Sequence, residues 1–208
     1  QRVDAGHQQA GSPLAEAELL YEKDRYPDAG ETLQAALSLN PRSNAAWYLL
    51  GRILVEGLEF PKAESVANKL DELAAPGISA EGAIVRAMIR LRQNEGEAAE
   101  QILAPALAKF PEHRMLLAVN AAAAAAKFDF KLADERLAAY DALAPGSPEA
   151  YMAAGRAVAS ARQYDEAAAY LREAAKRAPM WAEPVTELGL SELQAGHNDA
   201  SEEALDKA

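Results

Sequence analysis

The stretch YMAAGRAVASARQYDEAAAYLREAAKRAP, residues 151–179, contains the pattern from which the fold can be predicted. An aromatic residue opens it, Gly155 follows one turn later, a second aromatic stands at Tyr164, and Pro179 closes it. Segments of the same kind recur along the chain, since five prolines follow one another at intervals of 34 or 35 residues: Pro41, Pro76, Pro111, Pro145 and Pro179. A sequence period in this range is typical of stacked helical repeats.

Three further positions align when the segments are superimposed. The first holds small residues: Ala17, Gly51, Ala87, Ala121, Gly155 and Gly189. The second is also small: Ala29, Ala63, Ala99, Ala133, Ala167 and Ser201. The third is aromatic in four of six units, at Tyr26, Phe60, Phe130 and Tyr164, whereas the third unit has Gly96 there. Small residues at the first two positions let the paired helices of one unit approach closely, and stacked units share one core.

This pattern resembles the tetratricopeptide repeat family, most clearly in Trp47-Tyr48-Leu49-Leu50-Gly51 and in residues 151–179. The resemblance covers nearly the whole chain and implies an all-α, right-handed superhelical solenoid of about six helix-turn-helix units. We expect a disordered lead-in over residues 1–12 and one solenoid domain over residues 13–208. Its units are expected at about 10–43, 44–79, 80–113, 114–147, 148–181 and 182–208. Two extra residues near Pro76–Ser79 leave the register of the third unit's first helix open by one residue.

Local signals agree with a helical array. Ser43 and Ser79 are placed to cap helices, and Ser147-Pro148-Glu149 is typical of an N-cap, a proline at the first helical position and an acid in the first turn. No segment alternates between apolar and polar residues with the period of two that a half-buried strand requires. The sequence therefore predicts helices and no strands.

Composition excludes several classes of function. The 208 residues have a formal net charge of −11 and a pI of about 4.8, which argues against sustained binding to nucleic acid. Cysteine is absent, which excludes a disulfide framework and a cysteine-based zinc site. No apolar run approaches the roughly 20 residues that span a bilayer. The histidines are scattered, and neither a His-Glu-x-x-His, a Gly-x-Ser-x-Gly nor a phosphate-binding glycine motif occurs. We expect no catalysis, cofactor or metal in these residues.

The resemblance implies that the first helix of each unit lines a concave groove that holds a protein or peptide. Carried over by position, the partner-binding residues are Tyr21, Tyr48, Arg52, Val55, Ile84, Met88, Arg92, Met152 and Arg156. This row is mainly apolar with three arginines, so we expect apolar anchors and an acidic group or carboxylate of the partner near an arginine. The alanines Ala118, Ala122 and Ala125 are expected to leave a shallow depression between bulkier units.

A structural interpretation of the same residues stays open. Tyr48 and Met152 could pack against a neighbouring helix as core, and Ile84 and Met88 could do so if the register of the third unit slips. The arginines could pair with glutamates of the chain itself; the candidates are Glu56, Glu81 and Glu149.

Three hypotheses for function follow. The first is a non-catalytic scaffold for protein–protein interaction. The second is a helical repeat module of a larger enzyme or of a secretion or cell-envelope protein, whose active domain lies outside this sequence. The third is self-association through apolar residues of the last unit, Leu193 and Leu205. The alanine-rich composition suggests a bacterial protein. The absence of cysteine and of a starting methionine favours the periplasm or cell envelope over the cytoplasm.

Overall fold

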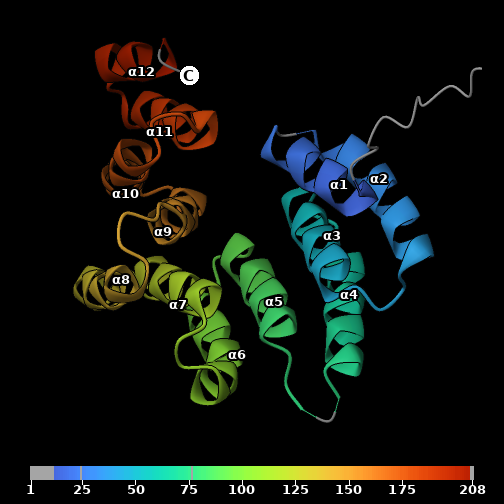
Figure 1. Ribbon diagram of the computed structural model, residues 1–208. Coiled ribbons are helices and arrows are strands. Elements are labelled where there is room, and N and C mark those ends of the chain that lie inside the picture. Colours follow the sequence, from blue (N-terminus) through green and yellow to red (C-terminus); the bar gives the residue numbers. More distant parts are fainter. Residues whose placement is uncertain (1–11, 24, 76, 207–208) are drawn as a thin grey trace, which may run out of the picture. The chain divides into compact units, whose positions relative to one another are not determined.

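The computed structural model describes residues 12–23, 25–75 and 77–206, which form twelve α-helices and no strand (Figure 1). The all-α class predicted from the sequence is confirmed. The first four helices are α1 (Pro13–Glu22), α2 (Tyr26–Leu39), α3 (Asn44–Glu56) and α4 (Phe60–Leu73). The other eight are α5 (Ala80–Arg92), α6 (Gly96–Lys109), α7 (Arg114–Ala126), α8 (Phe130–Leu143), α9 (Glu149–Ser160), α10 (Tyr164–Arg177), α11 (Ala182–Ala195) and α12 (Asn198–Leu205).

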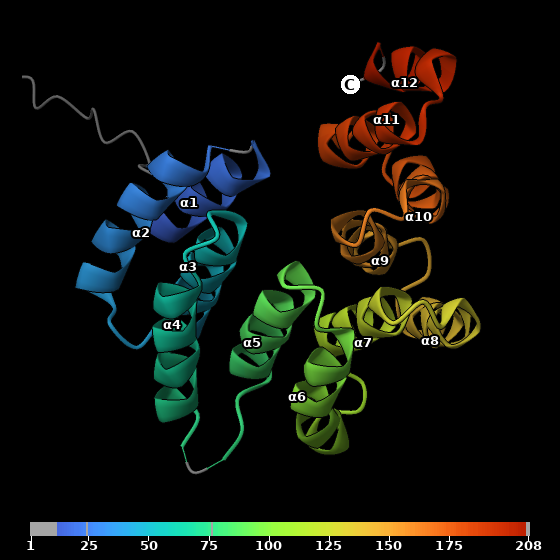
Figure 2. The same ribbon diagram turned by 180° about the vertical axis from the view of Figure 1, so that it is seen from behind.

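The helices belong to two compact units, Gln1–Pro76 and Gly77–Ala208. In the first unit α1 pairs with α2, α3 pairs with α4, and α2 packs on α3. In the second unit the pairs are α5–α6, α7–α8, α9–α10 and α11–α12, and each pair packs on the next (Figures 1 and 2). Each unit is thus a stack of helical hairpins. A single solenoid domain over residues 13–208 stays a prediction.

The repeat positions predicted from the sequence coincide with the helix boundaries. The aromatic position is the first residue of the second helix of a pair at Tyr26, Phe60, Phe130 and Tyr164. The open register of the third unit is settled too, because α5 begins seven residues before Ala87, as α3 begins seven residues before Gly51. Gly96 replaces the aromatic at the start of α6 for lack of room: a Cβ there would lie 3.0 Å from the Ala123 carbonyl oxygen and from Ala126 Cβ.

Most of the predicted helix starts are confirmed. Ser43 Oγ accepts a hydrogen bond from the Ala46 amide at 3.2 Å, and Ser79 Oγ accepts one from the Gly82 amide at 3.0 Å. The predicted cap at Ser147 is wrong, because its hydroxyl donates to the Glu149 carboxylate and makes no cap hydrogen bond to α9. Ser12, assigned from the sequence to the lead-in, caps α1. The rest of that lead-in, residues 1–11, lies outside the described residues.

The turns of the five hairpins from α3–α4 to α11–α12 share one backbone feature. The residue in the middle of each of these turns has a positive φ, at Leu58 (57°), Asn94 (60°), Phe128 (60°) and Arg162 (63°), and Gly196 occupies the same place at 90°. Only glycine adopts this left-handed conformation without steric cost, and asparagine adopts it at reduced cost. Leucine, phenylalanine and arginine therefore hold strained conformations at equivalent positions of three hairpins.

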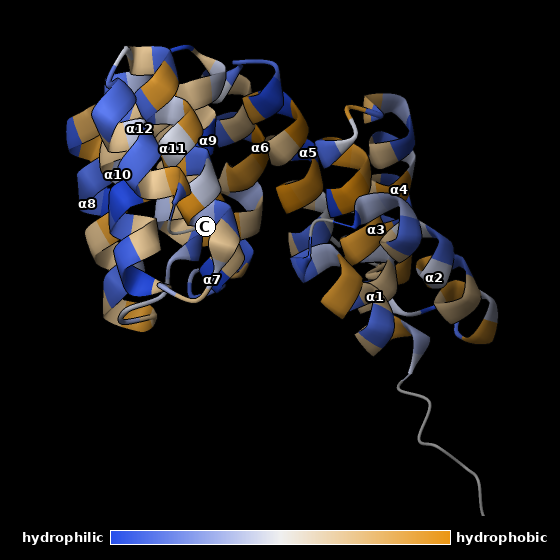
Figure 3. Ribbon diagram, turned by 90° about the horizontal axis from the view of Figure 1, so that it is seen from above, coloured by the Kyte–Doolittle hydropathy of each residue, from blue (hydrophilic) through white to orange (hydrophobic). Residues whose placement is uncertain are grey.

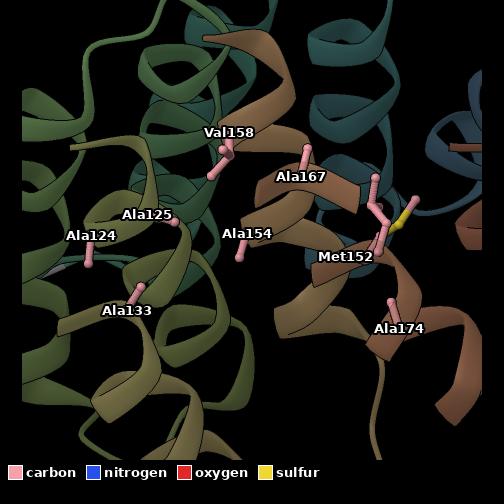
Figure 4. Packing of buried hydrophobic residues seen from close by; sticks show 9 residues of the cluster. Ala124, Ala125, Ala133, Met152, Ala154, Val158, Ala167 and Ala174 are labelled. Carbon is pink, nitrogen blue, oxygen red and sulfur yellow. The ribbon is translucent and has the colours of Figure 1, made fainter. Parts of the chain in front are cut away.

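Small residues bring the two helices of a pair together. A Cβ placed on Gly155 of α9 would lie 2.6 Å from Leu171 Cγ of α10, and one on Gly189 of α11 would lie 2.6 Å from Leu205 Cγ of α12. Around Gly155 the core consists largely of short buried side chains, including Ala124, Ala125 and Ala154, and Figure 4 shows these between the ribbons of neighbouring helices. Hydrophobic and hydrophilic residues share the same helices (Figure 3), so the apolar side of each helix can be buried while the other remains in water.

A charged cluster ties three helices of the second unit together. Arg177 of α10 donates a hydrogen bond of 2.9 Å to Asp141 Oδ2 of α8, and its guanidinium lies 3.8 Å from the ring centroid of Tyr151 on α9. The Tyr151 hydroxyl donates to the same Asp141 oxygen at 2.8 Å. The Arg177 hydrogen bond holds the pKa of Asp141 below its usual range, and burial together with the bond to Asp141 raises the pKa of Tyr151 to about 12.

Gly155→Ala tests the close approach of α9 and α10. We expect it to lower the free energy of unfolding by about 1–3 kcal/mol, because the added methyl group overlaps the Leu171 side chain. The matched control is Gly30→Ala in α2, where a Cβ would meet nothing within 4 Å and the substitution should stabilise the helix by up to about 1 kcal/mol. Urea denaturation followed by circular dichroism measures both; equal effects would contradict the packing described here.

Asp141→Asn tests the charged cluster through its pH dependence. A carboxyl with a lowered pKa in the folded state stabilises the protein above its unfolded pKa, near 3.8, and this contribution is lost as the pH falls through the folded pKa. We therefore expect the variant to be less stable than the parent at pH 7 by about 1–3 kcal/mol, with the difference shrinking below pH 3.8. Glu112→Gln, at an exposed site between α6 and α7, should show no such difference. If the difference in the free energy of unfolding between the parent and Asp141→Asn stayed constant from pH 7 to pH 3, the Asp141 carboxylate would not be the source of the stabilisation.

Candidate binding surface

The residues predicted to bind a partner all lie on first helices of the hairpins. Tyr21 is on α1; Tyr48, Arg52 and Val55 are on α3; Ile84, Met88 and Arg92 are on α5; Met152 and Arg156 are on α9. Helices α1 and α3 belong to the first unit, and α5 and α9 belong to the second. Within each unit, all the predicted residues therefore lie on the first helix of a hairpin and none on a second helix. Whether these residues contact a partner stays a prediction.

Burial separates the nine residues into two groups. Four side chains are part of the core, with exposed fractions of 9% or less: Tyr21, Val55, Ile84 and Met152. The other five are half-buried and reach the surface: Tyr48, Arg52, Met88, Arg92 and Arg156. For Ile84 and Met152 this is the core alternative left open by the sequence. In the case of Ile84 it holds without any slip of register.

In the first unit, two tyrosine rings lie close to the guanidinium of Arg52. The guanidinium carbon of Arg52 lies 4.5 Å from the ring centroid of Tyr21 and 5.8 Å from that of Tyr48. The Tyr21 ring in turn packs against Tyr26 with a centroid separation of 5.2 Å. A cation over an aromatic face is stabilised by roughly 0.5–2 kcal/mol. The cluster fixes a planar, permanently charged donor at a half-buried position on α3.

In the second unit, Arg156 is bound by two carboxylates of the chain itself. Arg156 on α9 donates through Nε to Glu187 Oε1 at 3.0 Å and through Nη2 to Glu183, both on α11. The Arg156 and Glu183 side chains are only 20% and 12% exposed. Sequence reasoning missed these two partners, which stand 27 and 31 residues away. Their spacing of four residues, which places both on one side of a helix, was the available signal.

The expected depression over the alanines of α7 is absent. Ala118, Ala122 and Ala125 are fully buried. The prediction was wrong because α7 packs directly against α9, so that these short side chains are covered by the neighbouring helix. The alanine-rich stretch is therefore packing surface within the second unit.

Metal-binding clusters and membrane-spanning helices were sought among the described residues. Over residues 12–23, 25–75 and 77–206, no group of three or more histidine, aspartate or glutamate side chains could hold a metal ion. None of the helices described is both long enough and apolar enough to cross a bilayer.

Arg156→Ala tests the link between α9 and α11. We expect a loss of about 1–3 kcal/mol in the free energy of unfolding, because Glu183 and Glu187, four residues apart on α11, would lose the guanidinium that they share while remaining partly buried. In a double-mutant cycle with Glu187→Gln, the combined loss should be smaller than the sum of the single losses, by about 0.5 kcal/mol or more. Arg162→Ala, exposed in the next turn of the same unit, is the control. Strict additivity in the cycle would show that the two side chains are not coupled.

Comparison with known proteins agrees with this geometry. Residues 14–78 match a family model described as Tetratricopeptide repeat. The chain is similar to the crystal structure of TTC0263, a thermophilic TPR protein in Thermus thermophilus, with a TM-score of 0.65, 23% identity, and coverage of 87% of this chain and 97% of that one. It is also similar to PilW, described as a widely conserved type IV pilus biogenesis factor, with a TM-score of 0.55, 20% identity, and coverage of 92% and 88%.

A third solved structure extends the same likeness. The chain matches a chain of the APC/C hetero-tetramer Cut9–Hcn1 with a TM-score of 0.62 and 16% identity, over 94% of this chain and 38% of that one. The search of curated proteins found no match. The resemblance noted in the sequence is confirmed: residues 14–78 match the tetratricopeptide repeat family, and the chain has the fold of tetratricopeptide repeat proteins.

Proposed function

We propose that this protein is a non-catalytic scaffold that binds a protein or peptide through the first helices of its hairpins. The observation that carries the proposal is the repeat fold itself, in which half-buried arginine, tyrosine and methionine side chains recur on those helices. Such surfaces bind extended or helical segments through apolar anchors and a few charged groups. The proposal applies to the surface of each unit separately.

Arg52 is the residue best prepared to recognise an acidic group. Its guanidinium is held over the Tyr21 ring, so little conformational entropy is lost when the planar fork meets a carboxylate. Arg156 is bound to Glu183 and Glu187 of α11. We place the acidic group of the partner at Arg52 in the first unit, because the rings of Tyr21 and Tyr48 already hold its guanidinium in position. In the second unit we place apolar contacts at Met88, with Arg92 on the same helix as a second cationic position.

The second candidate is a helical repeat module of a larger enzyme or of a secretion or cell-envelope protein. The likeness to PilW favours the cell-envelope form of this proposal over a cytoplasmic one. The gene sequence on either side of these residues tests it. A neighbouring catalytic or anchoring domain would support the module, whereas a start codon and a stop codon that directly flank the sequence would exclude it.

The scaffold proposal is tested with peptides selected by display on the immobilised protein. For peptides that contain an acidic residue, we expect Arg52→Ala to raise the dissociation constant about tenfold, because a charged hydrogen bond is lost. Calorimetry measures this change. Lys131→Ala removes one positive charge from the exposed side of α8 and should change affinity less than twofold. Equal affinity of the parent and Arg52→Ala, or hydrogen-exchange protection confined to second helices, would rule out the proposed surface.

A further inference from the structure

Two turns of the second unit hold exposed side chains on a strained backbone. Phe128, between α7 and α8, has a φ of 60° and is 49% exposed, and Arg162, between α9 and α10, has a φ of 63° and is also exposed. Asn94 and Gly196 hold the same place in the other two hairpins of this unit. Asparagine and glycine adopt the left-handed conformation at lower cost. The geometry of the turn therefore does not account for a phenylalanine or an arginine.

Contacts within the protein do not account for these two side chains either. The centroid of the Phe128 ring lies 6.3 Å from that of Phe130, and about half of the Phe128 surface stays in water. The other two exposed arginines of the second unit have polar partners, since Arg114 is hydrogen-bonded to a serine and Arg172 to a glutamate. Among the residues that the structure describes, the Arg162 guanidinium has no hydrogen-bond or ion-pair partner.

The two turns lie next to each other, because the helices that lead into them are packed together (Figures 1 and 2). Ala125, near the end of α7, and Val158, near the end of α9, belong to one buried cluster, and Phe130 packs against the same cluster. Phe128 and Arg162 follow shortly after these two helix residues in the sequence. An exposed aromatic ring and an exposed guanidinium are thus presented from neighbouring turns, and we call these two side chains the turn edge.

The acidic groups closest in sequence to the turn edge are engaged elsewhere. Asp129 caps α8 by accepting a hydrogen bond of 3.1 Å from a backbone amide. Two glutamates of α6 are bound by Lys127. Asp165, in the first turn of α10, lies 3.7 Å from the Nε2 atom of a histidine. The turn edge therefore carries a permanent positive charge at Arg162 that no carboxylate among the described residues neutralises.

We propose that the turn edge is a second binding surface, for a segment of a partner protein that places a carboxylate next to an apolar side chain. The Phe128 ring takes up the apolar side chain, and the Arg162 guanidinium pairs with the carboxylate. Strained residues cluster at such sites, where contact with a ligand and not stability determines the side chain. A nucleic acid would also bring flat rings and negative charge, but the net charge of −11 disfavours it.

The test uses a short peptide, blocked at both ends, in which leucine and glutamate alternate. In one comparison peptide glutamine replaces glutamate, and in the other alanine replaces leucine. Fluorescence anisotropy should show that the parent protein binds the leucine–glutamate peptide about fivefold or more tightly than either of the others. The proposal fails if this peptide does not bind, or binds no better than the glutamine peptide. Tighter binding of single-stranded oligouridine than of the peptide would also overturn it.

Phe128→Asn separates binding from folding, because Asn94 holds the same turn position in another hairpin. We expect affinity for the leucine–glutamate peptide to fall about fivefold or more, while the midpoint of thermal unfolding stays the same or rises. Leu58→Asn is the matched control: it replaces a strained apolar residue of the first unit that is 62% exposed, and should change affinity less than about twofold. Equal losses of affinity in both variants, or a clearly lower unfolding midpoint for Phe128→Asn, would contradict the proposal.

Arg162→Gln tests the contact with the carboxylate. It should remove the preference for the glutamate peptide over the glutamine peptide, whereas Arg52→Ala, on the surface proposed above, should keep it. If Arg52→Ala weakens binding and Phe128→Asn does not, the probe binds at the first helices, so that the turn edge fails and the scaffold proposal stands. A dimer in light scattering that Phe128→Asn dissociates would make a second copy of the chain the occupant and overturn the proposal. The turn edge contains none of the nine residues of the scaffold proposal, so the two can fail separately.

Discussion

The structure depends on the close approach of two helices at one small residue in each hairpin. Gly155 and Gly189 leave only enough room for the leucine that faces them, Leu171 and Leu205. This contact sets how far apart the paired helices lie, and so determines which side of the second helix remains available for the next hairpin. Because packed interiors tolerate little change in volume, a repeat of this kind keeps its geometry while most of its surface residues vary.

Much of the fold could be predicted because its determinants are local. The aromatic residues Tyr26, Phe60 and Tyr164 mark the first residues of second helices, and the caps at Ser43 and Ser79 mark the starts of first helices. The binding surface was harder to predict. Burial of Ala122 depends on how closely α7 packs against α9, and the partners of Arg156 lie on the following hairpin. Both are properties of contacts between repeats, which the residues of a single repeat do not encode.

Ion pairs join neighbouring hairpins of the second unit. Between neighbouring hairpins, Arg136 pairs with Glu100 and Arg177 pairs with Asp141, each across 36 residues of sequence. These pairs link second helices to one another, and Arg156 links first helices in the same way. Acidic residues outnumber basic ones in residues 1–76, by 12 to 7, and in residues 178–208, by 7 to 1, whereas residues 77–177 contain 13 of each. The negative charge of the protein therefore comes from the two ends of the sequence, and the hairpins between them, where the Arg136 and Arg177 pairs lie, are balanced.

The left-handed turn residues depend on the helices that they connect. Leu58, Phe128 and Arg162 adopt a positive φ that their side chains disfavour, with nearly the same angle at each site. A conformation of this kind persists only where the surrounding structure holds it, because the residue alone would relax to another one. The packing of the two helices against each other, rather than the residues of the turn, therefore maintains these three connections. A substitution that loosened the contact between the helices would also remove the support of the turn that joins them.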